Sequence, residues 1–519
     1  MDTDSLWRKL HPPQERGPLE RDEETEVCVV GAGIAGLATA YELLKDGRKV
    51  TILDASTVGG GETAHTTAHL ASALDDRYFE IERMHGTDGA HLAYDSHSTA
   101  IQWFERTAAD EGIDCDFASV DGYLFLPPGG DPSILDRELE AVHRIGMADA
   151  EMLPRSPLLH FDTGRCIRFP RQAQIDPLAF VEGLTAAIER LGGVIHGETH
   201  VNDFAKHPTL SVGTDQGRTV RAQHVVFATN TPVNDRVAIH TKQHAYLSYA
   251  IALPVDAGTV PLGLYWDTSQ TAEEDPDGPY HYVRLQRSSQ SGQQLLIVGG
   301  EDHKVGQADD AMERWVRLER WARERFPVTG QVAAQWSGEV LEPIDGVAFI
   351  GPDPGGPDGV YIATGDSGMG MTHGAIAGML ISDLVAGREN AWASLYDPSR
   401  RRLKAAGTYA EENLNTAAQY ADWLQKGAST KDGEPVAGTG AIVRRGLRLV
   451  ARYRDRSGMV HECSAVCPHL GGIVRWNSTG DGSWDCPAHG SRFDPYGKVF
   501  HGPSLGSLEP ERAHTNTKK

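Results

Sequence analysis

The sequence has no long apolar run and no excess of basic residues. None of its stretches is long and apolar enough to cross a membrane, and residues 1–25 are polar and acidic, unlike a signal peptide. Against 49 basic residues stand 72 acidic ones, which gives a net charge of -23. Such a surface disfavours nucleic acid and anionic membranes. We therefore expect a cytoplasmic protein with no membrane span and no nucleic-acid partner.

Cysteine is also scarce. Six cysteines in 519 residues do not indicate a disulfide scaffold, and a reducing compartment would keep them as thiols. Three of them, Cys463, Cys467 and Cys486, lie close together near the C-terminus. In a reducing compartment such a group favours a metal site over disulfides. Cys463 is interpreted as a spare thiol.

Residues 26–54 have the order of a dinucleotide-binding unit. An apolar run over 27–30 predicts a strand, a glycine-rich turn follows, apolar spacing predicts a helix over 34–45, and a strand over 50–53 precedes an acid. The glycines of such a turn admit a pyrophosphate, which binds N–H groups at the helix start, while the acid binds a ribose. The predicted contacts are Gly31, Gly33, Ile34, Ala35, Gly36 and Asp54.

A glycine run followed by small hydroxylated residues occupies 58–70, and such a loop can lie flat against a planar cofactor. With the preceding unit it resembles the FAD-dependent amine oxidoreductases of the D-amino-acid oxidase, glycine oxidase and sarcosine oxidase superfamily. The resemblance covers residues 20–400 and implies FAD as cofactor, with contacts from Gly61, Thr63, His65 and Thr66. Related dehydrogenases attach the flavin covalently to a histidine at this place. Ala64 replaces the Trp that usually precedes it, so His65 is either covalently attached or a non-covalent neighbour.

Further segments resemble the same superfamily. Residues 228–230 are similar to the Ala-Thr-Gly end of a strand beneath the adenine half of FAD, with Asn in place of Gly. The glycine-rich turn 365–374 resembles the C-terminal flavin motif, whose helix start suits the electron-rich edge of a reduced flavin. These resemblances add six predicted FAD contacts: Val201, Thr229, Gly365, Gly370, Met371 and Thr372.

A second sheet is predicted from strands over 247–255, 280–287 and 294–300. Alternation places Tyr280, Tyr282, Arg284 and Gln286 on one face. The superfamily covers the flavin with such a sheet, from which an Arg or Tyr holds a substrate carboxylate. Tyr282 and Arg284 therefore join His65 as predicted catalytic residues, since a guanidinium matches a carboxylate with two hydrogen bonds. An arginine on a solvated sheet face is the alternative.

The C-terminal cysteines alternate with histidines. Cys467 and His469 form one pair, and Cys486 and His489 form another. Two thiolates on one iron and two imidazoles on the other are the ligands of a Rieske 2Fe-2S cluster. A Cys2His2 zinc site is the alternative, although zinc fingers place cysteines together and histidines together. The flanking residues resemble Rieske loops.

Two departures from respiratory Rieske proteins bear on the cluster potential. Gly472 and Ala488 stand where those proteins have a disulfide, and Phe493 stands where they have a Tyr hydroxyl. Both features raise the potential. Their absence predicts a potential toward the lower end of the Rieske range.

The predicted fold class is an α/β, Rossmann-like FAD-binding domain with an interleaved α+β substrate domain, followed by a small all-β Rieske domain. A connecting helix is predicted over 409–424. The predicted boundaries are an N-terminal extension, 1–24; the oxidoreductase, 25–400, with FAD-binding segments 25–80, 175–245 and 335–400 and substrate segments 81–174 and 246–334; the connection, 401–432; and the Rieske domain, 433–512.

The predicted function is oxidation of a small-molecule amine or amino acid. Hydride from the C–H next to nitrogen would reach the flavin, and electrons would continue to the cluster and to a one-electron acceptor protein. An NAD(P)H-dependent reductase feeding an oxygenase is an alternative, but we find no second nucleotide-binding unit. A Rieske oxygenase is less favoured, because the sequence lacks the mononuclear-iron motif of that class. A non-enzymatic redox sensor is the remaining alternative.

Overall fold

The computed structural model describes residues 3–206, 209–231, 233, 239–268, 280–400, 435–446 and 448–511. The connection predicted over 401–432, with its helix at 409–424, lies outside the described residues. Within the described ranges, no helix is long and apolar enough to cross a membrane.

The first sheet follows from the buried apolar runs of the dinucleotide unit. Its order is β18-β19-β12-β2-β3-β8, and all neighbours are parallel except the edge strand β18. β2 and β3 are buried at every position, because parallel sheets are covered on both faces. The bounds are β2 Val27–Val30, β3 Val50–Leu53, β8 Val194–His196, β12 His224–Phe227, β18 Phe349–Pro352 and β19 Val360–Thr364.

Two of the helices, α2 and α7, pack against each other through small residues. A Cβ at Gly378 of α7 would lie 2.8 Å from the Ala38 side chain of α2, so these helices touch closely. α3 is interrupted at Gly86, which has a φ of 78°. The helices are α1 Leu6–Leu10, α2 Ile34–Lys45, α3 Tyr78–Glu111, α4 Ser133–Arg144, α5 Pro177–Arg190, α6 Ala311–Arg325, α7 Gly370–Val385 and α8 Ala393–Tyr396, with a 3-10 turn η1 at Glu62–Ala64.

A small second sheet has the order β1-β11-β10-β9. β9, which begins at the predicted FAD contact Val201, pairs antiparallel to β10. The bounds are β1 Glu23–Glu24, β9 Val201–Ala205, β10 Leu210–Thr214 and β11 Thr219–Ala222.

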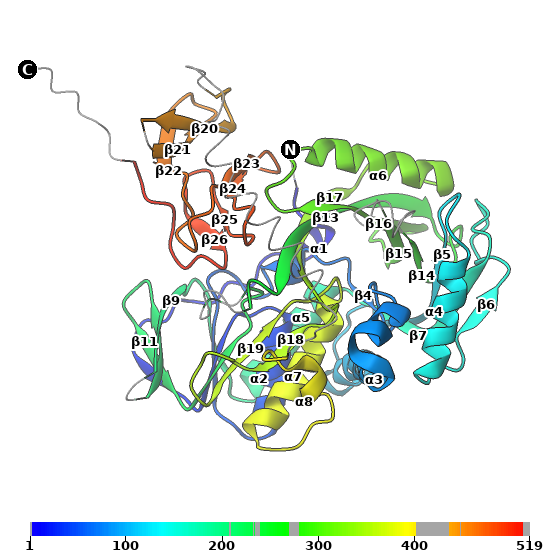
Figure 1. Cartoon of the computed structure of the whole chain (residues 1–519), viewed down its shortest axis with the longest axis horizontal. Coiled ribbons are helices and arrows are strands. Elements are labelled where there is room, and N and C mark those ends of the chain that lie inside the picture. The colour runs from blue at the N-terminus through cyan, green and yellow to red at the C-terminus, as the bar shows by residue number, and fades with distance from the viewer. Residues whose placement is uncertain are drawn as a thin grey trace, which may run out of the picture.

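The large sheet has the order β17-β13-β16-β15-β14-β5-β7-β4, with β6 paired to β7. Alternation divides its faces: Leu247, Ile251 and Val283 pack in one apolar cluster with Trp315 of α6, whereas the opposite face looks toward the first sheet (Figure 1). The bounds are β4 His69–Leu70, β5 Ala118–Phe125, β6 Glu151–Leu153, β7 Cys166–Gln174, β13 Gln243–Asp256, β14 Leu264–Asp267, β15 His281–Arg287, β16 Gln293–Lys304 and β17 Ala334–Pro343.

Residues 435–511, the C-terminal unit, form two small antiparallel sheets, β20-β21-β22 and β23-β24-β25-β26. In Figure 1 this unit, orange and red, lies above the junction between the β9–β11 sheet and the β13–β17 strands. The bounds are β20 Thr439–Arg445, β21 Arg448–Arg454, β22 Val460–Ser464, β23 Arg475–Asn477, β24 Ser483–Asp485, β25 Arg492–Phe493 and β26 Val499–His501.

Candidate active site and cluster centre

A cavity of about 1120 Å³ runs between the first sheet, the large sheet and the C-terminal unit. Small-molecule pockets typically measure roughly 300–1,000 Å³, so this one has room for a large cofactor with a substrate. Its wall includes Gly31 and Gly33 at one part, Tyr282 of β15 at another, and His501 of β26.

The glycine turn after β2 is shaped for close approach. Gly31 has a φ of 107°, and a Cβ there would lie 2.3 Å from the Ala228 carbonyl oxygen. A Cβ at Gly36 would lie 1.9 Å from the Gly31 carbonyl oxygen, so Gly36 serves the packing of α2 on this turn. The start of α2 thereby lies on the cavity wall, and the start of a helix is a place that binds a pyrophosphate.

Asp54 lies on the cavity wall at the end of β3. Its Oδ2 accepts a hydrogen bond from Ala32 N at 2.6 Å, and its Oδ1 accepts one from Ser56 N at 2.8 Å. Burial raises the pKa of Asp54, and these backbone donors oppose that shift. The carboxylate therefore fixes the glycine turn as well as facing the place of a ribose.

Most of the predicted FAD contacts lie on this one wall. Gly365 and Thr372 do not: Gly365, with a φ of 71°, lies against Pro343 and Gln243, and the Thr372 hydroxyl pairs with His97 Nδ1 at 2.8 Å. Gly36 lies behind the wall. The predicted contacts on the wall are Gly31, Gly33, Ile34, Ala35, Asp54, Gly61, Thr63, His65, Thr66, Val201, Thr229, Gly370 and Met371.

His65 lies on the wall in the turn that follows η1. Its Nδ1 pairs with the Gly61 carbonyl oxygen at 3.1 Å, and its own carbonyl accepts a hydrogen bond from Trp336 Nε1 at 2.8 Å. Burial lowers the pKa of His65, which keeps the imidazole neutral. A neutral ring held in this way suits either of the two predicted roles.

The large sheet supplies the other end of the wall. Tyr282 of β15, Trp266 of β14 and Ser248 of β13 all face the cavity, and Ser248 Oγ lies 2.7 Å from the Tyr282 hydroxyl. Gly299 of β16 makes this possible, since a Cβ there would lie 2.2 Å from the Tyr282 ring. The predicted face of Tyr280 and Tyr282 is the cavity face.

Arg284 does not reach the cavity, in contrast to its predicted contact with a substrate carboxylate. Its guanidinium is fully buried, and Nη1 donates to the carbonyl oxygens of Ala68 and Ile175, both at 2.8 Å. The Trp7 ring of α1 lies 5.3 Å from it. Burial lowers the pKa of Arg284 to about 9. The side chain therefore holds the loop before β4, and the alternative of a solvated sheet face is equally wrong.

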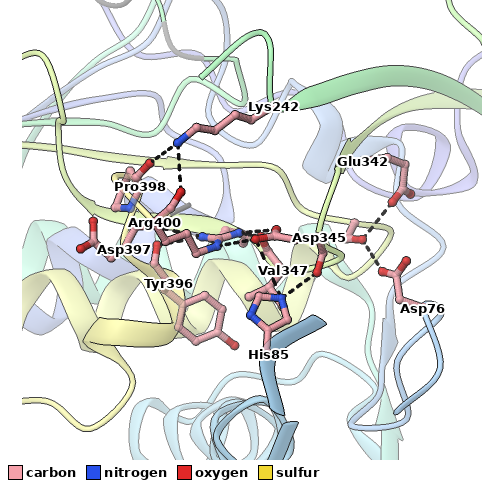
Figure 2. A network of polar contacts seen from close by, with 12 residues as sticks. Asp76, His85, Lys242, Glu342, Asp345, Val347, Tyr396, Asp397, Pro398 and Arg400 are labelled. Carbon is pink, nitrogen blue, oxygen red and sulfur yellow. Dashed lines mark hydrogen bonds and ion pairs between the residues drawn. The ribbon is translucent and has the colours of Figure 1, made fainter. Parts of the chain in front are cut away.

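Two half-buried carboxyl groups lie behind the turn of the C-terminal motif. Ser367 Oγ lies 2.6 Å from Asp76 Oδ2 and 2.9 Å from Glu342 Oε2 (Figure 2). One hydroxyl proton can be donated to only one of them, so the second contact needs a protonated carboxyl. Burial raises the pKa of Asp76 to about 7 and that of Glu342 well above its usual range. The two carboxyl groups are therefore linked through the Ser367 hydroxyl, and one of them carries a proton.

The four predicted cluster ligands lie on two loops, and each loop is closed by the same kind of backbone hydrogen bond. Cys467 N donates to Gly472 O at 2.8 Å, and Cys486 N donates to Ser491 O at 2.8 Å. The thiols of Cys467 and Cys486 are close enough to shift each other's pKa, and the rings of His469 and His489 lie 5.0 Å apart. Two sulfur and two nitrogen donors in separate pairs fit a 2Fe-2S cluster.

The two loops touch where respiratory proteins have their disulfide. A Cβ at Gly472 would lie 3.1 Å from the Ala488 Cβ, so the loops meet through a glycine. Phe493 is fully buried and has no hydroxyl to offer. Ser491, also fully buried, lies close enough to Cys467 for its hydroxyl to lower the pKa of that thiol. No role for Ser491 was predicted from the sequence.

The histidine side of the cluster centre lies against the oxidoreductase part of the chain. The His240 ring lies 4.8 Å from that of His469 and 6.1 Å from that of His489. A Cβ at Gly490 would lie 2.6 Å from Ala245 of β13. The loop of His469 therefore lies against His240, and the loop of His489 lies against the start of β13.

A buried ion pair joins the same two parts of the chain. His501 Nε2 of β26 lies 3.1 Å from Glu339 Oε1 of β17, and both side chains are nearly inaccessible. Glu339 and Glu62 raise the pKa of His501 against the effect of its burial. Sequence reasoning missed His501, Glu339 and Asp75 of the cavity wall, because no local pattern connects strands so far apart in the chain.

This arrangement defines a flavin-dependent oxidoreductase joined to an iron–sulfur module. Residues 26–384 match the family described as FAD dependent oxidoreductase (DAO), and residues 430–511 match the Rieske [2Fe-2S] domain. The chain belongs to the DAO family and carries a C-terminal Rieske domain. Its cofactors are FAD and a Rieske 2Fe-2S cluster, and the predicted fold class is confirmed.

Relatives agree with this assignment. The Bacillus subtilis (strain 168) protein YhfW, whose name describes a Rieske 2Fe-2S iron-sulfur protein, is 30% identical over 95% of this chain and 94% of its own length. The gamma-glutamylputrescine oxidoreductase of Escherichia coli (strain K12) is 26% identical over 71% of this chain and 86% of its own. Glycine oxidase from Geobacillus kaustophilus shares the fold, with a TM-score of 0.59 and 19% identity, over 73% of this chain and 99% of that structure.

Proposed function

We propose that this oxidoreductase acts on a small-molecule amine or amino acid and delivers the electrons to its own Rieske cluster, from which a one-electron acceptor protein in the cytoplasm takes them. When bound, FAD supplies two-electron acceptance and the cluster supplies one-electron transfer. A neutral amine, R–CH2–NH2, loses one hydride from carbon and becomes R–CH=NH2⁺, which water converts to an aldehyde and ammonium. The hydride carries both electrons.

One observation carries this proposal. The same cavity is lined by Gly31 and Gly33, by Tyr282 of the large sheet, and by His501 of the Rieske domain. One cavity therefore adjoins the glycine turn for the dinucleotide, the sheet proposed to hold the substrate, and the Rieske domain. The packing of His240 against both cluster histidines supports electron transfer between the two parts, because it brings the histidine side of the cluster centre against the oxidoreductase part of the chain.

The residues of this chain act by positioning and by excluding water. Trp7 of α1 is fully buried and donates to Thr66 O at 2.6 Å, which fixes the loop beside the predicted flavin contacts. The Rieske segment 498–507 covers another side of the cavity.

Anaerobic bleaching of the flavin tests the proposal. The holoenzyme is mixed with a panel of primary amines, secondary amines and amino acids, beside NADH and NADPH. We expect bleaching by an amine or amino acid, followed by the electron paramagnetic resonance signal of the reduced cluster. Faster bleaching by NADPH than by every amine and amino acid would favour the reductase alternative and refute the proposal.

A further inference from the structure

The substrate end of the cavity lies between the C-terminal flavin motif and the large sheet. Asp75 belongs to the wall there, beside Gly368: a Cβ at Gly368 would lie 2.6 Å from Asp75 Oδ2. Tyr280 and Tyr282, on the opposite side, are close enough to sense the charge of Asp75. Asp75 keeps substantial accessible surface although it lies deep in the protein, because that surface faces the cavity.

A second carboxyl group stands behind this wall. Asp302 of β16 is close enough to the Ser248 and Tyr280 hydroxyls for them to oppose the effect of burial on its pKa, and both of these residues line the cavity. Its Oδ1 is buried and has no hydrogen-bond partner among the described residues. Burial and the nearby Asp75 raise the pKa of Asp302 to about 6. Unsatisfied buried acceptors of this kind favour a ligand that brings donors and positive charge.

At this end the described part of the cavity wall carries no Lys or Arg, although Arg77 and Arg314, both off the wall, lie near enough to act on Asp75 and Asp302. Among the described residues of the cavity wall, Lys498 is the one Lys or Arg, and it lies beside His200 on the Val201 side of the cavity. Arg77 is off the wall and donates to the Leu74 carbonyl oxygen. His69 is on the wall, but burial lowers its pKa to about 3, so its ring is neutral.

Arg284, the one guanidinium on the cavity face of β15, is held by backbone carbonyl oxygens. A substrate carboxylate at this end would therefore lose its hydration next to Asp75 without gaining a cation. Burying a charge without a partner is costly. An ammonium group would instead meet one carboxylate and several hydroxyl oxygens.

We propose that the substrate is a cationic alkylamine, such as a di- or polyamine without a carboxylate beside the reacting carbon, and that Asp75 is the residue that selects it. This rests on the proposed function, which leaves amine and amino acid open. The Tyr280 and Tyr282 hydroxyls and the Trp266 ring complete the contact surface for the alkyl chain and its ammonium. Trp266 also offers its face to a cation.

Binding is tested first with ligands that cannot be oxidised. tert-Butylammonium and trimethylacetate have nearly the same shape, opposite charges and no hydrogen on the carbon that carries the charged group. Titration of the holoenzyme is followed by the flavin absorption spectrum and by thermal shift. We expect tert-butylammonium to bind at least about tenfold more tightly, since a hydrogen bond to a charged group contributes about 1.5–3 kcal/mol. Equal binding, or tighter binding of trimethylacetate, would overturn the assignment.

Asp75→Asn then tests the role of this residue in selecting the cation. Asp88→Asn is the matched control, because it removes the same charge from an exposed position on α3. Asp75→Asn should remove the preference for the cation, while Asp88→Asn should keep it. Tyr280→Phe, which removes a hydroxyl and no charge, should weaken the preference by less. A preference that survives in a folded, FAD-loaded Asp75→Asn protein would contradict the role of Asp75.

Oxidation separates this inference from the proposed function. 1,4-Diaminobutane and 4-aminobutanoate share the same reacting CH2–NH2 group and differ at the far end. We expect the diamine to bleach the flavin at lower concentration, and Asp75→Asn to raise its KM with a smaller effect on kcat. Bleaching by amino acids in preference to all cationic amines would refute the substrate class and leave the proposed function standing. Cation binding without bleaching by any amine or amino acid would refute the proposed function alone.

Discussion

The buried ion pair between His501 and Glu339 should stabilise the contact between the Rieske domain and the oxidoreductase part of the chain. The side chains are 11% and 0% exposed, and their charged atoms lie 3.1 Å apart. His501→Leu leaves Glu339 buried without its partner, and breaking such a pair costs about 3–5 kcal/mol. Arg492 lies near the same carboxylate and offsets part of the loss, so we expect the lower end, about 3 kcal/mol, which corresponds to roughly a hundredfold in docking.

The assay separates flavin reduction from cluster reduction. In the His501→Leu protein, substrate should still bleach the flavin, whereas the signal of the reduced cluster should appear more slowly than in the unchanged protein. His461→Leu is the matched control, because His461 pairs with Asp455 at 3.0 Å inside the Rieske domain. Cluster reduction at the normal rate in His501→Leu, or equal slowing in His461→Leu, would refute the docking role.

The same pair predicts a pH dependence. The carboxylates around His501 raise its pKa, so its contribution to docking is complete below its ordinary pKa near 6.5 and is lost as pH rises through the raised value. Cluster reduction in the unchanged protein should therefore slow at alkaline pH. His501→Leu should remove this step, and a step of the same size in both proteins would contradict the assignment.

Three other results are expected. Gly33→Val should abolish FAD binding, because even a Cβ would lie 3.2 Å from the Thr63 hydroxyl on the cavity wall; full FAD content in the purified protein would contradict this. Arg400→Met should lower the free energy of unfolding by about 3–5 kcal/mol, because it removes both hydrogen bonds, each of 2.8 Å, that the guanidinium donates to the buried Asp345 carboxylate. Figure 2 shows these contacts. Denaturant unfolding measures the loss, and a value below about 1 kcal/mol would be too small for a buried pair. The cluster midpoint, titrated by electron paramagnetic resonance, should fall in the lower half of the Rieske range of about -150 to +300 mV, and a value in the upper half would contradict the reading of Gly472, Ala488 and Phe493.

The sequence was most informative where a function is built from neighbouring residues. The strand, turn and helix around Gly31 and the ligand spacing from Cys467 to His489 are local patterns, so both could be recognised without the fold. The helix over Ile34–Lys45 and the strands Val27–Val30 and Val50–Leu53 begin and end as predicted.

Distant contacts account for what could not be predicted. Alternation along β15 gave the correct face for Arg284, but it could not show that Trp7 and the loop at Ala68 lie between this side chain and the cavity. The roles of Asp75 and His501 depend on elements that meet only in the folded chain. The pairing of the strand that begins at Val201 could not be predicted either, since pairing partners are not local.

The order of electron flow is the central claim, and His489→Ala tests it most directly. The change removes a cluster ligand and touches none of the predicted FAD contacts. After anaerobic mixing with a reducing substrate, the flavin should bleach as in the unchanged protein, no Rieske signal should appear, and turnover with a one-electron acceptor should fall steeply. Loss of flavin bleaching in a variant that keeps its FAD and its fold, or normal turnover, would contradict passage of electrons from flavin to cluster.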